Sequence, residues 1–173
     1  MESLEKAALG YLERYASSAA NLRRVLMRRV ERAARAGACE RAKGARMADE
    51  VVEGYRARNL LNDRAYAEGR VQTLHRQGRS RTRIAQTLAA KGVAREEIDR
   101  ALAAFEAETP EADLVAALAL ARRRRLGPYR AAGQRSKFRQ RDLAALARAG
   151  FSLEIARRVV DAARPETIEA ELA

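Results

Sequence analysis

Four clusters of basic residues have the types and spacing to do chemistry, and that chemistry is the binding of anions. Basic side chains gathered on one face attract phosphates and carboxylates, as on surfaces that contact polyanions. A solvated basic face is the competing interpretation for every cluster, because a run of charge alone is weak evidence. The candidate residues are Arg23, Arg24, Arg28 and Arg29; Arg76, Arg79, Arg81 and Arg83; Arg122, Arg123, Arg124 and Arg125; and Arg135, Lys137, Arg139 and Arg141.

Two of these clusters carry more charge than helix electrostatics requires. The arginines at 122–125 close an expected helix, where one or two cations would be enough to complement the helix dipole. The cluster at 135–141 spans an expected loop and helix start, where cations are mildly unfavourable. An external anionic partner is therefore a reasonable explanation for both clusters.

No constellation for catalysis, nucleotide binding or metal binding accompanies the basic clusters. Lys43 and Gly44 stand in the wrong order for a phosphate-binding loop. His75 is the single histidine and Cys39 the single cysteine, so neither a catalytic triad, a zinc site nor a disulfide is expected. The adjacent carboxylates Glu96 and Glu97 point apart on a helix. We therefore expect a binding protein rather than an enzyme, with no metal and no cofactor.

The net charge of +12 over 173 residues is unevenly distributed. Residues 1–48 carry +6, 49–110 carry +1, 111–164 carry +8 and 165–173 carry −3. Most of the bases are arginine, which fits a GC-rich genome as well as contact with a polyanion. The acidic N-terminus and the short apolar runs predict neither a signal peptide nor a membrane span, and a lone cysteine fits a reducing compartment. We therefore expect a cytoplasmic protein that does not enter a membrane.

A recurring pattern indicates repeated helices. A hydroxyl residue is followed by apolar residues four and eight positions later and by a base eleven positions later. This is a helix cap, an apolar stripe and a basic last turn. Units that each carry part of a core predict a helical array, because no unit can bury its stripe alone. The copies are Ser18, Leu22, Leu26 and Arg29; Ser80, Ile84, Leu88 and Lys91; and a degraded third that ends at Leu146, Ala149, Gly150 and Phe151.

The caps and stripes divide the chain into three units of three helices, and the fold class is all-α. The expected units are residues 1–60 with an extended basic insertion at 31–48, residues 61–108, and residues 109–164. An acidic tail, residues 165–173, follows and is expected to fray.

Local signals place the helix ends within these units. Ser18, Ser80 and Ser152 are expected N-caps, and Thr109 is expected to cap a helix that starts at Pro110. Residues 37–47 are rich in glycine and poor in apolar residues, which predicts a loop.

Residues 80–105 also have the outline of a helix-turn-helix. Its second helix, however, would present Glu96, Glu97 and Asp99 to DNA phosphates. A sequence-specific transcription factor is therefore not expected.

The order and spacing of several motifs resemble the RecX family, bacterial regulators of the RecA recombinase. The resemblance covers about residues 4–163. Two features depart from the family pattern: the long basic segment 31–48, and Asn62, where an acid is common. The stretches that carry the resemblance are Ala7–Leu12, Leu22–Arg29, Leu61–Ala67, Gly78–Val93, Ala119–Gly127 and Arg141–Ser152.

The resemblance implies three tandem three-helix repeats in an elongated, curved helical array. It also implies a regulator that lies along the groove of the RecA–DNA filament and blocks filament growth, ATP hydrolysis and strand exchange. Some members bind DNA directly, so single- or double-stranded DNA is an expected second partner, and we expect a monomer. No catalytic or ligand motif of the family can be carried over, so the candidate residues rest on charge alone. A general nucleic-acid-binding repeat protein and a scaffold that binds only protein remain open alternatives.

Overall fold

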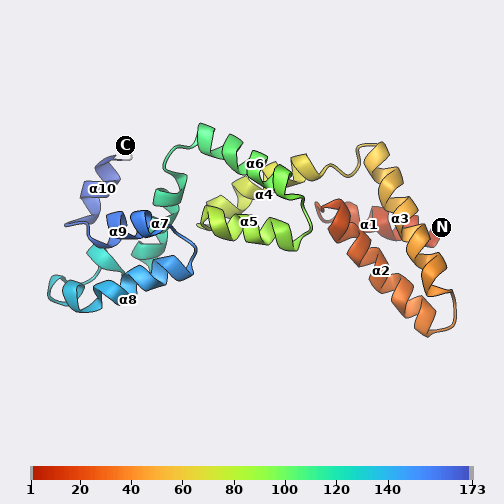
Figure 1. Cartoon of the computed structure of the whole chain (residues 1–173), viewed down its shortest axis with the longest axis horizontal. Coiled ribbons are helices and arrows are strands. Elements are labelled where there is room, and N and C mark those ends of the chain that lie inside the picture. Colours follow the sequence, from red (N-terminus) through yellow and green to blue (C-terminus); the bar gives the residue numbers. More distant parts are fainter. Residues whose placement is uncertain (1, 172–173) are drawn as a thin grey trace. The chain divides into compact units, whose positions relative to one another are not determined.

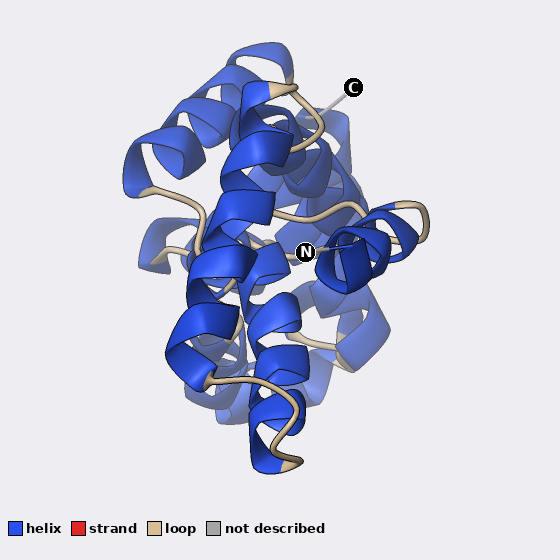
Figure 2. Ribbon diagram, turned by 90° about the vertical axis from the view of Figure 1, so that its right-hand side faces the viewer, coloured by secondary structure: helices blue, strands red, loops and turns tan. Residues whose placement is uncertain are grey.

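The computed structural model describes residues 2–171 (Figure 1). This part of the chain consists of helices joined by short loops and contains no strand (Figure 2), so the all-α fold class is confirmed. None of its helices combines the length and the apolar composition needed to cross a bilayer. The helices are α1 (Glu2–Leu12), α2 (Ala19–Arg35), α3 (Arg41–Ala57), α4 (Asp63–Arg76), α5 (Arg81–Ala90), α6 (Arg95–Glu108), α7 (Ala112–Arg124), α8 (Arg135–Arg148), α9 (Leu153–Val160) and α10 (Pro165–Glu171), with short 3₁₀ turns η1 (Gly127–Tyr129) and η2 (Ala132–Gln134).

The helices group into two compact units, which we describe separately. The first unit contains the described residues up to Gly69 together with Leu88–Ile98. The second contains Arg70–Thr87 together with the described residues from Asp99 onward. Helix α5 contributes its first part to the second unit and its end to the first.

Helices α2 and α3 form the centre of the first unit. Leu22, Leu26 and Val30 of α2 lie in one buried cluster with Val51 and Tyr55 of α3. Apolar residues recur every three or four positions on both helices, so each presents one face to the other.

The start of α3 corrects one expectation from the sequence. The segment 37–47 was expected to be a loop, but α3 begins at Arg41. The expected insertion 31–48 is thus the end of α2, a short turn and the start of α3. A Cβ on Gly44 would lie 2.5 Å from Cγ1 of Val30. Gly44 therefore allows α2 and α3 to pack closely, and does not break the helix as the local sequence indicated.

Helices α7, α8 and α9 form the core of the second unit. Leu114 and Leu118 of α7, Leu143 and Leu146 of α8 and Val159 of α9 lie in one buried cluster. This cluster holds α7 and the second half of α8 in place. Two of the basic sequence clusters lie beyond it, at the end of α7 and at the start of α8.

The serine caps are confirmed, and the threonine cap is wrong. The Oγ atoms of Ser18, Ser80 and Ser152 each accept a hydrogen bond from the N–H three residues later, at 3.2, 3.3 and 3.2 Å. Thr109 instead donates its hydroxyl to the Phe105 carbonyl, at 2.5 Å, one turn earlier. This bond holds Thr109 at the end of α6, and α7 begins only at Ala112.

The acidic tail is helical, which contradicts the expectation that it frays. Helix α10 begins at Pro165, and Ile168 is 3% exposed in the core cluster of the second unit. Burial of this one apolar side chain explains why the tail is ordered despite its acidic composition. The end of the expected tail, residues 172–173, lies outside the described residues.

Candidate polyanion-binding surface

Helix α7 ends in four exposed arginines, Arg122–Arg125. The body of the helix is held in place because Leu114, Leu118 and Ala121 are buried, and the last turn extends beyond this core. None of the four side chains has a hydrogen-bonding or ion-pairing partner within residues 2–171. These guanidinium groups are therefore available to a partner.

Arg125 has a backbone conformation that normally favours glycine. Its φ and ψ are 54° and 51°, and the following Leu126 N–H donates to the Ala121 carbonyl at 2.9 Å. This is a helix end closed by a left-handed residue. A side chain at such a position costs about 1–2 kcal/mol. Strain of this kind points to a function for the side chain.

The turn after α4 brings two more arginines beside this cluster. Helix α4 ends at Arg76, and Gly78 adopts a φ of +76° at the turn before Arg79. Nη2 of Arg123 lies 3.6 Å from the place that a Cβ would occupy on Gly78. Arg76 and Arg79 are exposed and also lack a partner in the described chain. We refer to Arg76, Arg79 and Arg122–Arg125 as the arginine patch.

The arginine patch gathers like charges without an acid to balance them. Two unit charges 4 Å apart repel by about 1 kcal/mol in water and about 4 kcal/mol near a protein surface. The C-terminal dipole of α7 offsets part of this repulsion, by about 0.3–1 kcal/mol for each cation. A bound polyanion would relieve the remainder.

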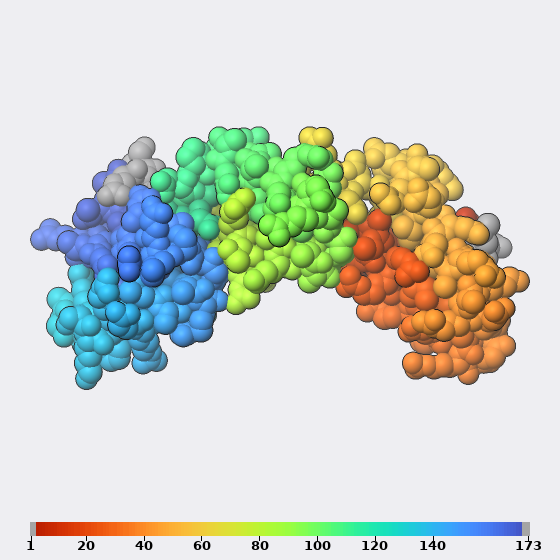
Figure 3. Space-filling model, viewed as in Figure 1, coloured from red at the N-terminus to blue at the C-terminus, as the bar shows by residue number. Residues whose placement is uncertain are grey.

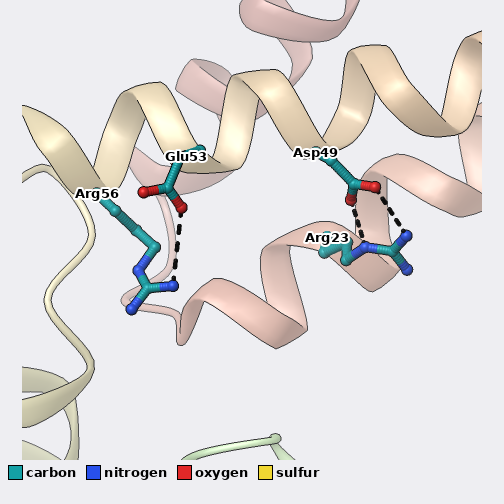
Figure 4. A network of polar contacts seen from close by, with 4 residues as sticks. All are labelled: Arg23, Asp49, Glu53 and Arg56. Carbon is teal, nitrogen blue, oxygen red and sulfur yellow. Dashed lines mark hydrogen bonds and ion pairs between the residues drawn. The ribbon is translucent and has the colours of Figure 1, made fainter.

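The cluster on α2 contains both paired and free arginines. Arg23 donates to both carboxylate oxygens of Asp49, at 2.5 and 3.2 Å (Figure 4). The hydrogen bond from Arg23 lowers the pKa of Asp49. Arg28 and Arg29 are exposed, and their side chains have no partner in the described chain.

Arg81 and Arg83 make contacts inside the second unit. Nε of Arg81 lies 2.6 Å from a carboxylate oxygen of Glu106. Arg83 donates to the side-chain oxygen of Gln86 at 3.0 Å and to the Arg148 carbonyl at 2.8 Å. The predicted cluster at 76–83 therefore divides into two free arginines and two that hold other elements.

The cluster at the start of α8 is divided in the same way. Arg135 donates to three backbone carbonyls, at 2.6–3.1 Å. Arg139 donates to both oxygens of Asp161 at 2.6 Å, and this bond lowers the pKa of Asp161. Lys137 and Arg141 are exposed and make no hydrogen bond or ion pair in the part of the chain described, although both lie 5.9 Å from the centre of the Phe138 ring and Arg141 helps to lower the pKa of Asp142. Only two of the four predicted residues are thus available for binding.

Asp142 is a structural carboxylate that the sequence analysis missed. Its side chain is 1% exposed and accepts hydrogen bonds from the Gly127 N–H and, at two points, from Arg130. Burial would raise the pKa of Asp142, but the bonds from Arg130 and Gly127 outweigh it and the pKa is lowered. Arg130 also lies 4.6 Å from the centre of the Phe138 ring. The sequence does contain a signal for this role, because Asp142 directly precedes the apolar Leu143 on the expected helix. A carboxylate that becomes buried beside such a residue needs a hydrogen-bonding partner.

Comparison with known proteins identifies the family. A family model described as RecX, second three-helix domain, matches residues 62–102. A relative from Myxococcus xanthus, named regulatory protein RecX, is 45% identical over 159 residues, which cover 91% of this chain and 84% of the relative. This chain belongs to the RecX family.

A second relative and two solved structures are also similar to this chain. Regulatory protein RecX of Agrobacterium fabrum is 45% identical over 100 residues, covering 58% of this chain and 51% of that protein. A crystal structure of regulatory protein RecX matches 93% of this chain and 71% of its own, with a TM-score of 0.65 and 23% identity. The crystal structure of RecX from Lactobacillus salivarius covers 92% of this chain, and the match spans 94% of that protein, with a TM-score of 0.62 and 21% identity. The two structures support the fold.

A contact in the first unit of this RecX-family chain joins the start of α2 to the end of α5. The Ser18 hydroxyl donates to the Lys91 carbonyl at 2.5 Å. A carboxylate oxygen of Asp63 accepts the Ala19 N–H at 2.8 Å. Figure 3 shows the start of α2 packed directly against the end of α5. We refer to such a contact as a serine joint.

A second serine joint, in the second unit, connects the start of α5 to the end of α8. The Ser80 hydroxyl donates to the Ala149 carbonyl at 2.8 Å, and Asp113 accepts the Arg81 N–H at 2.8 Å. Burial raises the pKa of Asp113, although the Arg81 N–H opposes the shift. The recurring serine was visible in the sequence, but its acceptor and the aspartate were not.

An arginine and a glycine complete each serine joint. In the first joint Arg24 donates two hydrogen bonds to the Ala90 carbonyl, both at 3.1 Å. In the second joint Arg83 donates one hydrogen bond to the Arg148 carbonyl, at 2.8 Å. A Cβ on Gly92 would lie 2.5 Å from Cβ of Ala20 in the first joint, and a Cβ on Gly150 would lie 2.6 Å from Oγ of Ser80 in the second. Arg24 and Arg83, expected to bind a partner, therefore hold helix ends together in this RecX-family fold.

Proposed function

We propose that this chain binds RecA–DNA filaments and inhibits filament growth, ATP hydrolysis and strand exchange, thereby regulating DNA repair and recombination. Membership of the RecX family supports the regulatory role. The observation that carries the proposal is the arginine patch, in which six exposed guanidinium groups have no acidic partner in the described chain. In this proposal the chain acts in the cytoplasm as a monomer.

Phosphate contact explains how the patch would contribute. A guanidinium can donate two parallel hydrogen bonds to a phosphate, which fixes its geometry. Each neutralised phosphate lowers the slope of log affinity against log salt by about 0.9 on duplex DNA and about 0.7 on a single strand. If all six arginines engage, the patch contributes a slope of about 4 to 5.

The ATPase activity of RecA on single-stranded DNA tests the partner. Purified chain is added at increasing concentration to a preformed filament. Inhibition well below the concentration that saturates the DNA supports the proposal, because the chain then acts through the filament. Inhibition that appears only when the DNA is saturated supports the alternative, a general nucleic-acid-binding protein.

Replacement of the α7 arginines tests the surface. Changing all four of Arg122–Arg125 to Gln should weaken inhibition and flatten the salt slope by about 3. The fold should persist, because glutamine is a good helix former and only the dipole complement is lost.

The matched control removes the same charge elsewhere. Arg56, Arg58, Arg64 and Arg70 are changed together to Gln. Arg56 lies 3.8 Å from a Glu53 oxygen (Figure 4) and Arg64 lies 3.0 Å from one of Glu68, so their charge is already partly balanced. We expect a smaller effect from this set. Equal losses from both sets would show that total charge governs binding and that the patch has no special role.

A further inference from the structure

An open groove in the first unit combines exposed aromatic and basic side chains. It lies along α1, the segment that follows it and the middle of α2, and has a volume of about 830 Å³. Tyr15 and Leu9 line it and are 58% and 51% exposed. Large apolar side chains that remain exposed side by side mark an interaction site. Among the lining residues, only Arg29 belongs to the basic clusters that the sequence singled out.

The aromatic part of the groove is held rigidly. The rings of Tyr11 and Tyr15 lie 5.3 Å apart at 40°. The Tyr11 hydroxyl accepts a hydrogen bond from the Asn21 side chain at 3.0 Å, and the same amide donates to Ser17 at 2.9 Å. Tyr11 is therefore fixed, and Tyr15 presents its exposed ring beside a rigid neighbour.

The basic part of the groove is unpaired. Lys6, Arg14 and Arg29 line it, are exposed, and have no acidic partner within residues 2–171. Glu13 is the one acid in the lining. The groove therefore attracts anions, and its aromatic ring is placed among the cations.

We propose that this groove binds single-stranded nucleic acid, with a base stacked on Tyr15 and the adjoining phosphates held by Lys6, Arg14 and Arg29. An exposed aromatic ring in a basic groove is the combination that single strands need, because every base has a face to stack and every linkage carries a charge. A duplex keeps its base faces covered, so it cannot use the ring. Direct DNA binding is already an expectation of the family resemblance, and the new inference is its site, a groove along α1 that acts without the recombinase.

A second aromatic residue near cations shows why the choice falls on Tyr15. Phe138 is half-buried, and the Arg130 guanidinium lies 4.6 Å from its ring centre. That ring already has an intramolecular partner. Tyr15 has only the tilted contact with Tyr11, which leaves more than half of its surface open.

Binding of a labelled oligothymidylate, followed by fluorescence anisotropy with the full chain, tests the proposal. Tyr15→Ala should weaken single-strand binding by about 5- to 150-fold, because the stacking of one base is lost. Tyr15→Phe keeps the ring and should bind as the wild type does. A duplex of the same length should bind equally to all three proteins. Leu60→Ala removes another exposed side chain of the first unit, 57% exposed, and should change nothing.

Tyrosine fluorescence supplies a second readout. The chain has five tyrosines and no tryptophan, so quenching by an unlabelled oligothymidylate reports on tyrosine directly. Most of this quenching should disappear in Tyr15→Phe. Unchanged single-strand affinity in Tyr15→Ala would overturn the proposal. The proposal would also be overturned if oligoglutamate binding depended on Tyr15 and oligothymidylate binding did not, because the groove would then fit an acidic peptide. Neither result involves RecA, so the ATPase experiment fails or succeeds separately.

Discussion

Replacing Gly92 with alanine tests whether the first serine joint is closely packed. Gly92 follows α5 with a φ of +77°, and a Cβ there would lie 2.5 Å from Cβ of Ala20. The variant therefore carries two costs, one from the left-handed backbone and one from the collision. Gly37 follows α2 with a φ of +70° and has nothing within 4 Å, so Gly37→Ala carries the backbone cost alone.

The expected magnitudes follow from these two geometries. A side chain in the left-handed region costs about 1–2 kcal/mol, and alanine recovers about 0.4–1 kcal/mol by restricting the unfolded chain. The net loss for Gly37→Ala is therefore about 0–1.6 kcal/mol. Overpacking adds about 1–3 kcal/mol for Gly92→Ala, because the neighbour is a Cβ on α2 and cannot rotate away.

Urea unfolding followed by the helical circular dichroism signal measures both variants. Gly92→Ala should lose about 1–3 kcal/mol more than Gly37→Ala. The m-value should stay unchanged if both variants unfold in the same way as the wild type. Equal losses would refute the close approach of α2 and the end of α5, and with it the packing described for the first serine joint.

Two further substitutions test the second unit. Arg125→Gly should raise the free energy of unfolding by about 1 kcal/mol, because it relieves the strain of the left-handed backbone. The same change should weaken filament binding, because one guanidinium of the arginine patch is lost. A variant that binds as tightly as the wild type would contradict a binding role for Arg125. Asp142→Asn should lower the free energy of unfolding at neutral pH by about 1–3 kcal/mol, because charged hydrogen bonds are lost. Since the pKa of Asp142 is lower in the folded chain than in the unfolded chain, its stabilisation is complete above the unfolded pKa and disappears as the pH falls through the folded one. The two proteins should therefore converge in unfolding free energy below about pH 4, and a constant difference into strong acid would count against this account.

Helix caps could be predicted because their chemistry is local. Ser18, Ser80 and Ser152 each need only an N–H three residues later, and each forms that bond. Thr109 has the same cap chemistry available, but its hydroxyl bonds backward to the preceding helix. The local sequence contains both possibilities, and the position of Ala112 at the start of α7 decides between them.

Tertiary packing explains the two misplaced segments. Gly44 indicates a loop in the local sequence, but it is the residue that lets α3 approach Val30. Ile168 lies among acids in the sequence and becomes buried only because the core of the second unit receives it. Both outcomes depend on partners far along the chain.

The sequence predicted that the candidate surface consists of arginines, but it did not predict which of these arginines are free to bind a partner. The sequence identified Arg24 and Arg123 with equal weight. Arg24 is bonded to a carbonyl 66 residues away, whereas Arg123 is free and lies beside Gly78. Nothing in the neighbouring residues distinguishes the two, because the distant backbone supplies the acceptor. Which cations remain for a partner is a property of the fold.

The serine joints form a series with two ends, and the repeated pattern shows where it stops. Each joint needs a serine at the start of one helix and a glycine turn at the end of another. In the repeated pattern Phe138 of α8 occupies the place of the serine. Val30, at the place of the glycine, lies inside α2, which continues to Arg35. Helix α8 therefore lacks a serine at this place of the pattern, and α2 lacks a glycine turn at this place. The series of serine joints thus begins with the serine of α2 and ends with the glycine turn after α8.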